Sequence, residues 1–315
     1  MNPLSAIFGA GVVIRNALYD RRVFQVKKLA GPVVSIGNIS VGGSGKTPFV
    51  IALGQLLAEQ GIPFDVLSRG YGRSSTGIAV VDPQGSPAQF GDEPLLIARK
   101  LQAPVIVGAD RYQAGLLAER TFSSKLHLLD DGFQHRRQHR DFDIVLLPEE
   151  DQRGSLLPTG RLREPMTALS RADAVVLFDP ATSVAAKSIW HARRVIELPA
   201  AAGRTIVFSG IARPRQFVEG LKSSQLEIAS TIAFRDHHRY QQRDIDRLLD
   251  LRKQTKADGF ITTEKDLINL GTLASQLSPL LSAKLRMQLE SPQQAIMEII
   301  KTIEQRSGHQ IQPPA

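Results

Sequence analysis

A glycine-rich turn followed by lysine and threonine is the segment of this sequence best suited to chemistry. It lies between an apolar run at residues 32–36 and a helix-like stretch at 46–59. The residues of the turn are Gly42, Gly43, Ser44, Gly45, Lys46 and Thr47. Backbone N–H groups in such a turn bind anions at the positive end of a helix, a lysine binds β- and γ-phosphates, and a threonine hydroxyl binds Mg²⁺. The turn therefore predicts a binding loop for ATP and Mg²⁺.

The loop departs from the generic P-loop pattern at one position. Ser40 stands where G-x-x-x-x-G-K-[ST] has its first glycine, while the last three positions match. Gly42 and Gly43 still give the backbone freedom close to the phosphates. A turn that only connects a strand to a helix is the alternative, but the lysine and threonine at the helix start favour a phosphate loop.

Two adjacent aspartates end another apolar run of the chain. Asp130 and Asp131 follow residues 126–129, and a buried strand delivers its terminal carboxylates to the sheet edge where phosphates bind. Neighbouring side chains of a regular strand point to opposite sides, so we expect one carboxylate to hold the metal and the other to orient substrate. An ordinary pair of aspartates at the start of a loop is the alternative.

Two further clusters contain groups that can act as a general base. Asp92 precedes a predicted helix at 93–101, where it either caps the helix or accepts the proton of an attacking hydroxyl. Asp236, His237 and His238 form a carboxylate–histidine cluster, which can poise a base near neutral pH. Two adjacent histidines can also bind zinc, but a third ligand at a zinc-binding spacing is missing from this cluster.

Composition and basic segments favour an anionic substrate. The formal net charge is +8, and arginines gather at residues 69–73, which include Arg69, and at 160–165. Arginine suits bidentate contact with phosphate, although both segments can also be plain surface charge. Aromatic residues make up only 6% and are not interleaved with the basic ones, so no nucleic-acid surface is expected. The 315 residues contain no cysteine, which excludes disulfides, thiolate nucleophiles and cysteine-based metal sites.

Strand-like and helix-like segments alternate through the first half of the chain. The alternation predicts an α/β protein with a P-loop NTPase-like, mostly parallel sheet covered by helices on both faces. A polar segment at 151–170 is expected to be a long functional loop. The expected strands are 32–36, 64–67, 78–81 at an edge, 104–107, 126–129, 144–147 and 174–178, and the expected helices are 46–59, 93–101 and 111–120.

The pattern restarts after residue 180 and predicts a second, smaller α/β lobe. Its expected strands are 205–209, 228–234 and 259–262, and its expected helices are 213–220 and 242–253. We therefore expect three units. They are an N-terminal membrane-interface helix at 1–28, a P-loop kinase core at 29–184 and a smaller C-terminal α/β lobe at 185–315.

The N-terminal 28 residues combine apolar side chains at helical spacing with basic residues that mostly follow them. A secretory signal has its basic residues first, and no apolar run is long enough for a membrane-spanning helix. An amphipathic helix lying in a membrane interface is expected. Packing of the same helix on the protein's own core is the alternative.

An ordered set of these motifs resembles the tetraacyldisaccharide 4′-kinase family, the lipid A 4′-kinases of Gram-negative bacteria. The set spreads over residues 1–270 in the family's order, and Ser40 agrees with the family's own version of the loop. The matching segments are residues 35–48, 68–73, 91–93, 110–111, 130–135, 160–165, 236–237 and 262–266.

The resemblance implies phosphorylation of the 4′-hydroxyl of a tetraacylated glucosamine disaccharide 1-phosphate, with ATP and Mg²⁺, in lipid A biosynthesis. It implies a peripheral or monotopic protein on the cytoplasmic face of the bacterial inner membrane, which binds the membrane surface through the N-terminal helix. No nucleic acid and no obligate protein partner are expected. A soluble P-loop kinase of a small polar metabolite and a P-loop NTPase switch remain the alternatives.

The resemblance also implies roles for individual residues. Asp92 is implied as the catalytic base, His237 as its partner and Lys46 as the third catalytic residue. The choices between His237 and His238, and between Asp130 and Asp131 as metal ligand, stay open. Expected substrate contacts are Arg69, Arg111, Asp131, Gln134 and Arg163. Expected metal ligands are Thr47, Asp130 and Glu164.

Overall fold

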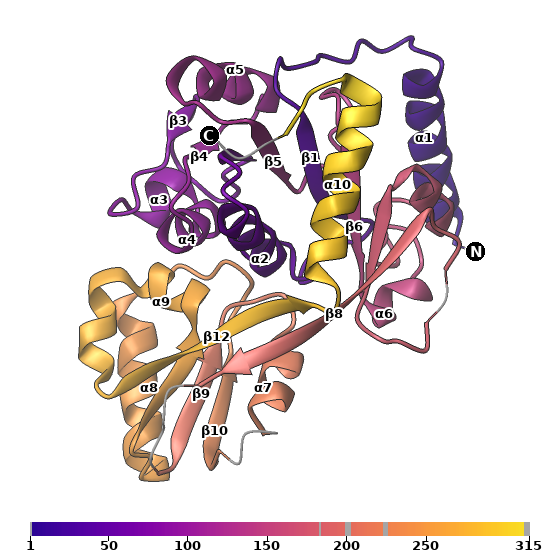
Figure 1. Ribbon diagram of the computed structural model, residues 1–315. Helices are drawn as coiled ribbons and strands as arrows, with labels where there is room; N and C mark the ends of the chain where they lie inside the picture. Colours follow the sequence, from indigo (N-terminus) through magenta and orange to yellow (C-terminus); the bar gives the residue numbers. More distant parts are fainter. Residues whose placement is uncertain (1, 183, 199–202, 223–225, 312–315) are drawn as a thin grey trace.

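The computed structural model describes residues 2–182, 184–198, 203–222 and 226–311. Within these residues, two α/β lobes lie side by side and share one twelve-stranded sheet (Figure 1). The larger lobe contains the first half of the chain, and the smaller lobe lies below it in this view. Residues 1 and 312–315, the outer ends of the first and last predicted units, lie outside the described residues.

A mostly parallel sheet forms the centre of the larger lobe. Its strands are β1 (Val33–Asn38), β2 (Phe64–Ser68), β3 (Ala79–Val80), β4 (Val105–Val107), β5 (Leu126–Asp130), β6 (Phe142–Leu147) and β7 (Ala174–Leu177). Their order is β7-β6-β1-β5-β2-β4-β3, and β3 alone among these seven pairs antiparallel. The central strands are buried along their length, as is typical of strands covered on both faces. The α/β prediction and the edge position of 78–81 are confirmed.

Helices cover both faces of this sheet. Buried side chains of α2 (Lys46–Glu59) and α4 (Asp92–Lys100) join Val66 in one cluster. Those of α5 (Arg111–Thr121) join Leu67 in another, because neighbouring strand residues point to opposite faces. Three short helices complete the lobe, and two of them bound the loop expected at 151–170. They are α3 (Pro87–Phe90), α6 (Glu149–Gln152) and the 3₁₀ helix η1 (Met166–Arg171).

The smaller lobe repeats the pattern of parallel strands and helices. Its strands are β9 (Thr205–Ser209), β10 (Ile228–Ala233) and β11 (Gly259–Thr263), with β9 in the middle. Its helices are α7 (Pro214–Lys222), α8 (Gln242–Thr255), α9 (Glu264–Leu270) and the 3₁₀ helix η2 (Gly271–Leu277). All five segments predicted for this lobe are present, with small shifts at their ends.

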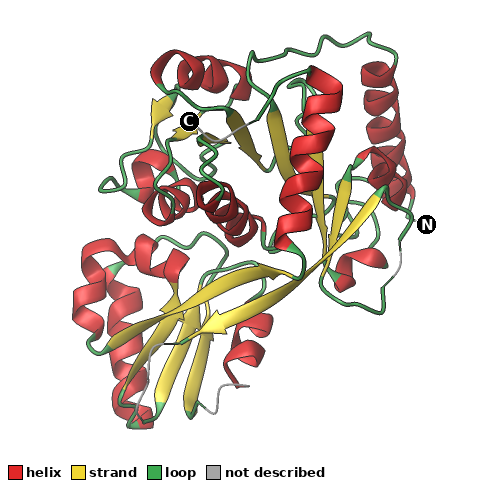
Figure 2. Cartoon of the chain, viewed as in Figure 1, coloured by secondary structure: helices red, strands yellow, loops and turns green. Residues whose placement is uncertain are grey.

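Two long strands that the sequence analysis missed join the lobes. β8 (Ser188–Glu197) pairs with β7 through its first residues and runs antiparallel to β12 (Leu280–Leu289) through the rest. The start of β12 pairs in turn with β11 of the smaller lobe. Figure 2 shows the pair as a twisted ribbon crossing from one lobe to the other. The two lobes therefore share one continuous sheet and are not separate domains joined by a flexible linker.

The last helix returns to the larger lobe. In α10 (Pro292–Ser307), the buried residues Ile296, Ile299 and Ile303 belong to the same core cluster as α2 and the strands of the larger lobe. The sequence analysis placed this segment in the unit at 185–315, whereas its apolar face packs on the larger lobe. The three-unit division itself stays a prediction.

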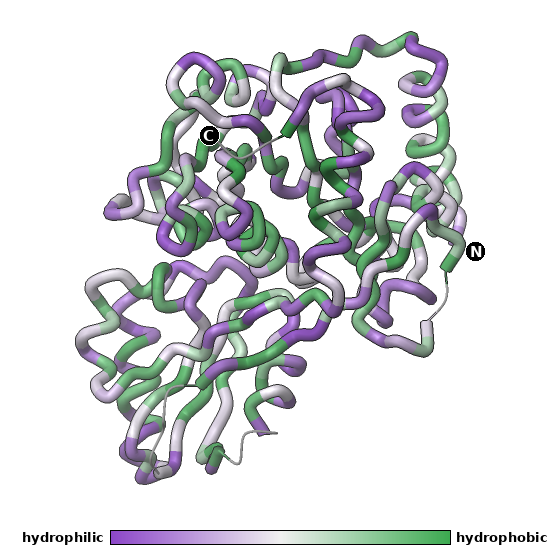
Figure 3. The backbone as a smooth tube through the Cα atoms, viewed as in Figure 1, coloured by the Kyte–Doolittle hydropathy of each residue, from purple (hydrophilic) through white to green (hydrophobic). Residues whose placement is uncertain are grey.

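Helix α1 (Pro3–Asp20) packs one face on the protein and exposes the other. Ser5 and Val12 are buried, and the Ser5 hydroxyl donates to the Leu156 carbonyl at 2.9 Å. Ile7 and Ile14, by contrast, are 71% and 60% exposed, and Figure 3 shows hydrophobic and neutral residues along most of this helix, with hydrophilic ones toward its C-terminal end. The helix thus packs one face on the protein and leaves apolar side chains exposed on the other, and its binding to a membrane stays a prediction. Among the described helices, none has the length and apolar character needed to cross a membrane.

Candidate active site

The glycine-rich turn lies between the carboxyl end of β1 and the start of α2. Gly42, Gly43 and Gly45 have φ values of 67°, 61° and 90°, a left-handed backbone that residues with side chains seldom adopt. Gly45 is the N-cap of α2, so the turn stands at the positive end of that helix. Its backbone therefore fits an anion site.

Lys46 connects this turn to the acidic end of β5. Its Nζ lies 3.2 Å from Asn38 Oδ1 at the end of β1 and 3.3 Å from Asp131 Oδ1 just after β5. The lysine side chain is only 13% exposed. The loop and the aspartate pair, about ninety residues apart in the chain, thus form one site, as parallel strand ends require.

The two adjacent aspartates have different surroundings. Asp130 is buried and accepts a hydrogen bond from the Ser68 hydroxyl at 2.9 Å, while its Oδ1 has no partner among the described residues. Asp131 adopts a left-handed backbone, with φ of 53°, and pairs with Lys46 and with Arg163 Nη1 at 3.2 Å. The two carboxylates therefore have different partners, as expected for neighbouring residues at a strand end.

The charges around the two aspartates also differ. Burial, together with the carboxylates of Glu93 and Asp131, raises the pKa of Asp130 to about 7. Burial opposes the charge of Asp131 as well, but Lys46 and Arg163 hold its pKa below the usual range. Asp131 thus forms ion pairs with two cations, whereas Asp130 forms no ion pair among the described residues.

Residues at this point fit a magnesium ion. Among the described residues, Asp130 Oδ1 and the Ser44 hydroxyl of the phosphate loop are both buried without a partner, and Thr47 of the same loop is also buried. Mg²⁺ prefers oxygen ligands and commonly takes one or two carboxylates, with phosphate and water oxygens for the rest. A group of three acidic, histidine or cysteine ligands is absent from the described part of the chain, and a magnesium site of this kind does not need one.

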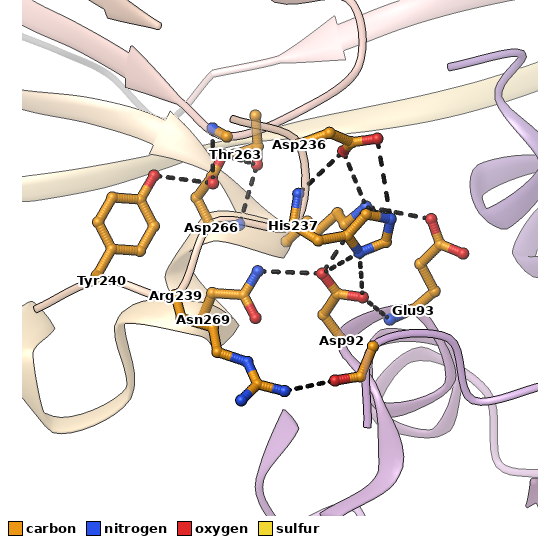
Figure 4. A network of polar contacts seen from close by, with 12 residues as sticks. Asp92, Glu93, Asp236, His237, Arg239, Tyr240, Thr263, Asp266 and Asn269 are labelled. Atoms are coloured by element: carbon orange, nitrogen blue, oxygen red, sulfur yellow. Dashed lines mark hydrogen bonds and ion pairs between the residues drawn. The ribbon is translucent and has the colours of Figure 1, made fainter. Parts of the chain in front are cut away.

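A carboxylate–histidine pair crosses from one lobe to the other. Asp92 begins α4 in the larger lobe, and its Oδ2 lies 2.9 Å from His237 Nδ1 and 3.0 Å from Asn269 Nδ2 of the smaller lobe. Figure 4 shows the two side chains pointing toward each other. His238 lies instead 2.9 Å from Asp244 and stacks on Phe234. The structure therefore pairs Asp92 with His237 and not with His238.

Lys265 links this pair to the carboxylates of Glu93 and Asp236. Its Nζ lies 3.2 Å from Glu93 Oε1 and from His237 Nε2, and 3.8 Å from Asp92 Oδ2. Although burial opposes its charge, the surrounding carboxylates raise the pKa of Lys265. No role was predicted for Lys265 or for Asn269 from the sequence. Their spacing of four residues on one helix, which puts both side chains on one face, was the available signal.

The surroundings shift the pKa values of both members of the pair. Burial disfavours the Asp92 carboxylate, but the hydrogen bond from His237 and the charge of Lys265 lower its pKa to about 2. Burial also disfavours a protonated His237, but the hydrogen bond to Asp92 leaves its pKa above the ordinary value. Asp92 is therefore an ionised acceptor over the whole physiological pH range.

The predicted substrate contacts border the phosphate loop and the aspartates. Arg163 Nη1 donates to Gln134 Oε1 at 3.3 Å, and Gln134 Nε2 donates to the Asn38 carbonyl at 2.8 Å. Arg111 is buried, with Nη2 3.2 Å from His135 Nδ1. Burial and the nearby charge of Arg69, which is exposed after β2, lower the pKa of Arg111. These positive groups leave a basic region beside the acidic strand end.

Glu164 has a different setting from the other predicted metal ligands. It is fully buried, and its Oε2 accepts hydrogen bonds from Arg171 Nη1 at 2.8 Å and from Asn16 Nδ2 of α1 at 2.7 Å. Its Oε1 accepts one from Gln134 at 3.2 Å. Glu164 therefore connects Asn16 of α1 to Gln134, which borders the phosphate loop. Its role as a metal ligand stays a prediction.

A phosphate loop, an acidic strand end and a carboxylate–histidine pair on one α/β sheet define a P-loop phosphotransferase. Comparison with known proteins is more specific. The chain belongs to the tetraacyldisaccharide-1-P 4′-kinase family, whose model matches residues 1–304. The predicted family and the predicted kinase class are thereby confirmed.

Individual relatives align with nearly the full length of this chain. A tetraacyldisaccharide 4′-kinase of Koribacter versatilis is 51% identical and aligns with 98% of this chain and 100% of the relative. One from Geobacter metallireducens is 37% identical and aligns with 92% and 93%. A crystal structure described as an "apo" form of LpxK from Aquifex aeolicus in complex with ATP matches with a TM-score of 0.79. It is 33% identical and covers 96% of this chain and 98% of that one.

Proposed function

We propose that this chain transfers the γ-phosphoryl group of ATP to the 4′-hydroxyl of a tetraacylated glucosamine disaccharide 1-phosphate, with Mg²⁺ as cofactor. Membership of the tetraacyldisaccharide-1-P 4′-kinase family supports the reaction. The ATP complex of the similar Aquifex aeolicus protein supports the nucleotide. The observation that carries the location of the chemistry is the contact of Lys46 with Asp131, because it joins the loop to the acidic strand end.

The larger lobe would bind the nucleotide phosphates. The amides of the loop and the Lys46 ammonium would hold the β- and γ-phosphates, with the ammonium moving its contact from Asp131 to phosphate oxygen. Ser44, Thr47 and Asp130 would hold Mg²⁺, and Glu164 is a further candidate. When bound, the ion supplies positive charge to the phosphate oxygens. The burial of Asp130 and its unpartnered Oδ1 support this assignment, and burial with the nearby carboxylates of Glu93 and Asp131 raises its pKa, which a bound cation would offset.

Asp92 would accept the proton of the attacking hydroxyl. Its pKa of about 2 makes it a weak base in the ground state. A loose transition state for phosphoryl transfer demands little early deprotonation, so a late transfer to an always ionised carboxylate suffices. His237 would orient Asp92 through the bond from Nδ1, and a proton taken from the acceptor would then reside on the Asp92 carboxyl.

Arginines and a glutamine would bind the anionic acceptor. Arg69 and Arg111 present positive charge beside the acidic strand end, and Arg163 and Gln134 border the loop. Guanidinium groups suit a sugar phosphate because they bind it through two parallel hydrogen bonds. Asp131 would keep Arg163 in place after Lys46 has turned to the nucleotide.

Helix α1 would hold the protein at the cytoplasmic face of the inner membrane, as a peripheral or monotopic protein. Its exposed face and the segment that follows carry large apolar side chains that nothing in the described chain covers. They are Leu4, Ile7, Val13, Ile14, Val23, Phe24 and Val26, which are between 41% and 71% exposed. Such a face suits the boundary between head groups and acyl chains, where the acceptor lipid lies.

Incubation of the purified protein with labelled ATP, Mg²⁺ and the disaccharide 1-phosphate in mixed micelles tests the reaction. We expect labelled lipid with phosphate at the 4′-position, and no product without Mg²⁺. Labelling of a small polar acceptor but not of the lipid would favour a metabolite kinase. ATP hydrolysis without any phosphorylated acceptor would favour an NTPase switch.

A further inference from the structure

An arginine of the smaller lobe reaches the phosphate loop of the larger lobe. Arg213, just before α7, lies with Nη1 2.8 Å from Glu150 Oε2 and with Nη2 3.1 Å from Asp151 Oδ1. Its side chain is only 10% exposed and packs on the loop, since a Cβ at Gly43 would come within 2.6 Å of Arg213 Cγ. The smaller lobe therefore touches the loop through a partly buried cation, next to Ala212, which lies against Gly42.

The carboxylate that Arg213 binds is itself bound to the loop. Asp151 is 1% exposed, and its Oδ2 accepts a hydrogen bond from the Ser40 hydroxyl. Ser40 is fully buried and stands where the generic P-loop pattern has glycine. A glycine would lack the hydroxyl that makes this contact, so the departure from the pattern has a structural consequence.

The chain of hydrogen bonds continues from Ser40 to Lys46. Asn38 Nδ2 donates to Ser40 Oγ at 3.1 Å, and Asn38 Oδ1 accepts from Lys46 Nζ at 3.2 Å. Asn38 and Ser40 are both fully buried. An unbroken series of contacts therefore runs from a guanidinium in the smaller lobe to the ammonium of the phosphate loop.

The direction of each bond in this series follows from the one before it. Asp151, as a carboxylate, only accepts, so the Ser40 hydroxyl must give it its single proton. Ser40 then has only lone pairs to offer, so the Asn38 amide must turn its NH₂ toward Ser40 and its carbonyl toward Lys46. Without Asp151 the hydroxyl is free to rotate, and a flipped amide would direct NH₂ at the ammonium. In a buried, low-dielectric setting such a reversal is unfavourable.

We propose that Asp151 and Arg213 are positioning residues that hold Lys46 in place through Ser40 and Asn38. Contact of the smaller lobe with the loop thereby sets the position of the ammonium that meets the nucleotide. The proposal rests on the proposed function for the role of Lys46. It differs from a plain interlobe ion pair, because a plain pair would stabilise the lobes without any dependence on the Ser40 hydroxyl.

Kinetics of Ser40→Ala, Arg213→Gln and the double variant test this proposal. Ser40→Ala removes one hydroxyl, and Arg213→Gln removes the cation at the far end of the series. We expect each to lower kcat about tenfold, the size of one lost hydrogen bond to a charged group. Because both act on Lys46 through the same series, the double variant should also fall about tenfold, not about a hundredfold. Arg204→Gln is the matched control and should keep wild-type kcat, because Arg204 pairs with Glu227 on the exposed surface of the same lobe.

Two results would overturn the proposal. One is a kcat of Ser40→Ala within about twofold of wild type, which lies below the effect of one such bond. The other is a double variant whose loss equals the product of the two single losses. Calorimetric affinity for a non-hydrolysable ATP analogue, measured on the same variants, needs no acceptor. A wild type that transfers no phosphate would thus refute the proposed function. The positioning proposal would still be tested by the affinity for the analogue: losses that do not add in the double variant would support it, and losses that add would reject it. Should Arg213→Gln fail to fold, Asp151→Asn replaces it in the cycle.

Discussion

The two lobes contribute to the site in different ways. The larger lobe presents its groups at the ends of fully buried strands, with Lys46 between Asn38 of β1 and Asp131 after β5. The smaller lobe presents His237 from a loop with a left-handed backbone, and Lys265 and Asn269 from a short helix. Strand ends in one sheet keep their spacing whatever the other lobe does. The contacts of Asp92 with His237, Asn269 and Lys265, by contrast, exist only while the lobes touch.

This difference divides the reaction between the lobes. The residues that would hold the nucleotide phosphates belong to the larger lobe, and the smaller lobe reaches their loop beside Arg213, which binds Asp151. The base is assembled across the boundary, so acceptor activation requires the smaller lobe. The predictions below change one side of this division at a time, and they run from the largest expected effect to the smallest.

Replacement of Lys46 by alanine should have the largest effect. It removes the cation of the phosphate site in the larger lobe, so we expect both nucleotide affinity and turnover to fall, with kcat/KM reduced about a thousandfold. Initial rates with the lipid acceptor and calorimetry with an ATP analogue measure the two losses. Lys253→Ala, at an exposed lysine in the smaller lobe, is the control and should behave as wild type. Near-normal turnover of Lys46→Ala would remove the loop from the chemistry.

Replacement of Asp92 by asparagine should separate the two halves of the site. The variant keeps the shape of the side chain but can no longer accept a proton, so we expect kcat to fall about a hundredfold. Affinity for the ATP analogue should stay unchanged, because Asp92 is bound to His237, Asn269 and Lys265 and not to a residue of the phosphate loop. Asp250→Asn, an exposed carboxylate on α8, serves as control. Loss of analogue affinity in Asp92→Asn would show that the two halves are not independent.

The sequence predicted the larger lobe better than the ribbon that joins the lobes. The helix expected at 46–59 has those bounds in α2, because a glycine turn marks its start and apolar spacing runs through it. β8 was missed because its residues include Arg193 and Arg194 and most of them are not buried. Its pairing partner β12 lies some ninety residues away, and such non-local pairing leaves no local pattern.

The contacts within the candidate site were also hard to predict from the sequence, because they join residues far apart in the chain. Residue types alone singled out Asp92 and His237 as candidates, but they are 145 positions apart, and only the packed lobes bring them to 2.9 Å. Lys265 was passed over because a lone lysine in a polar helix is most often exposed. Its three neighbouring carboxylates come from α4 and from the loop before α8. The chemistry of a residue is visible in a sequence, whereas its partners depend on tertiary structure.

Replacement of Lys265 by methionine tests the contribution of the smaller lobe to the base. Lys265 is one of the groups that lower the pKa of Asp92, so its removal should raise that pKa and move the acidic limb of the pH–rate profile to higher pH. We expect kcat at neutral pH to fall about tenfold through misplacement of His237 and Asp92. Lys265→Arg keeps the charge and should keep the position of the limb. An unchanged limb in Lys265→Met would mean that His237 alone sets the charge of Asp92.

The smallest expected effect concerns the dependence of stability on pH at the interlobe pair. Asp92 has a lowered pKa of about 2, so its contribution is complete above the ordinary value of 3.8 and is lost only as the pH falls toward 2. His237 has a raised pKa, so its contribution is complete below the ordinary value of 6.5 and is lost as the pH rises through the folded value. The melting temperature of wild type should therefore exceed that of His237→Gln most at about pH 5 to 6, and the gap should shrink toward about pH 9.

His309→Gln, at an exposed histidine near the end of the described chain, should show no such change with pH. A gap that grows with pH would mean that His237 is held neutral in the folded protein, with Lys265 donating to its Nε2 at 3.2 Å. The bond from Nδ1 to Asp92 would then be a neutral donor to a carboxylate, and the attraction between the lobes at this point would come from Lys265 alone. In that case the positive charge that the smaller lobe brings to Asp92 would come from Lys265 on α9, and His237 in the loop would only orient the carboxylate.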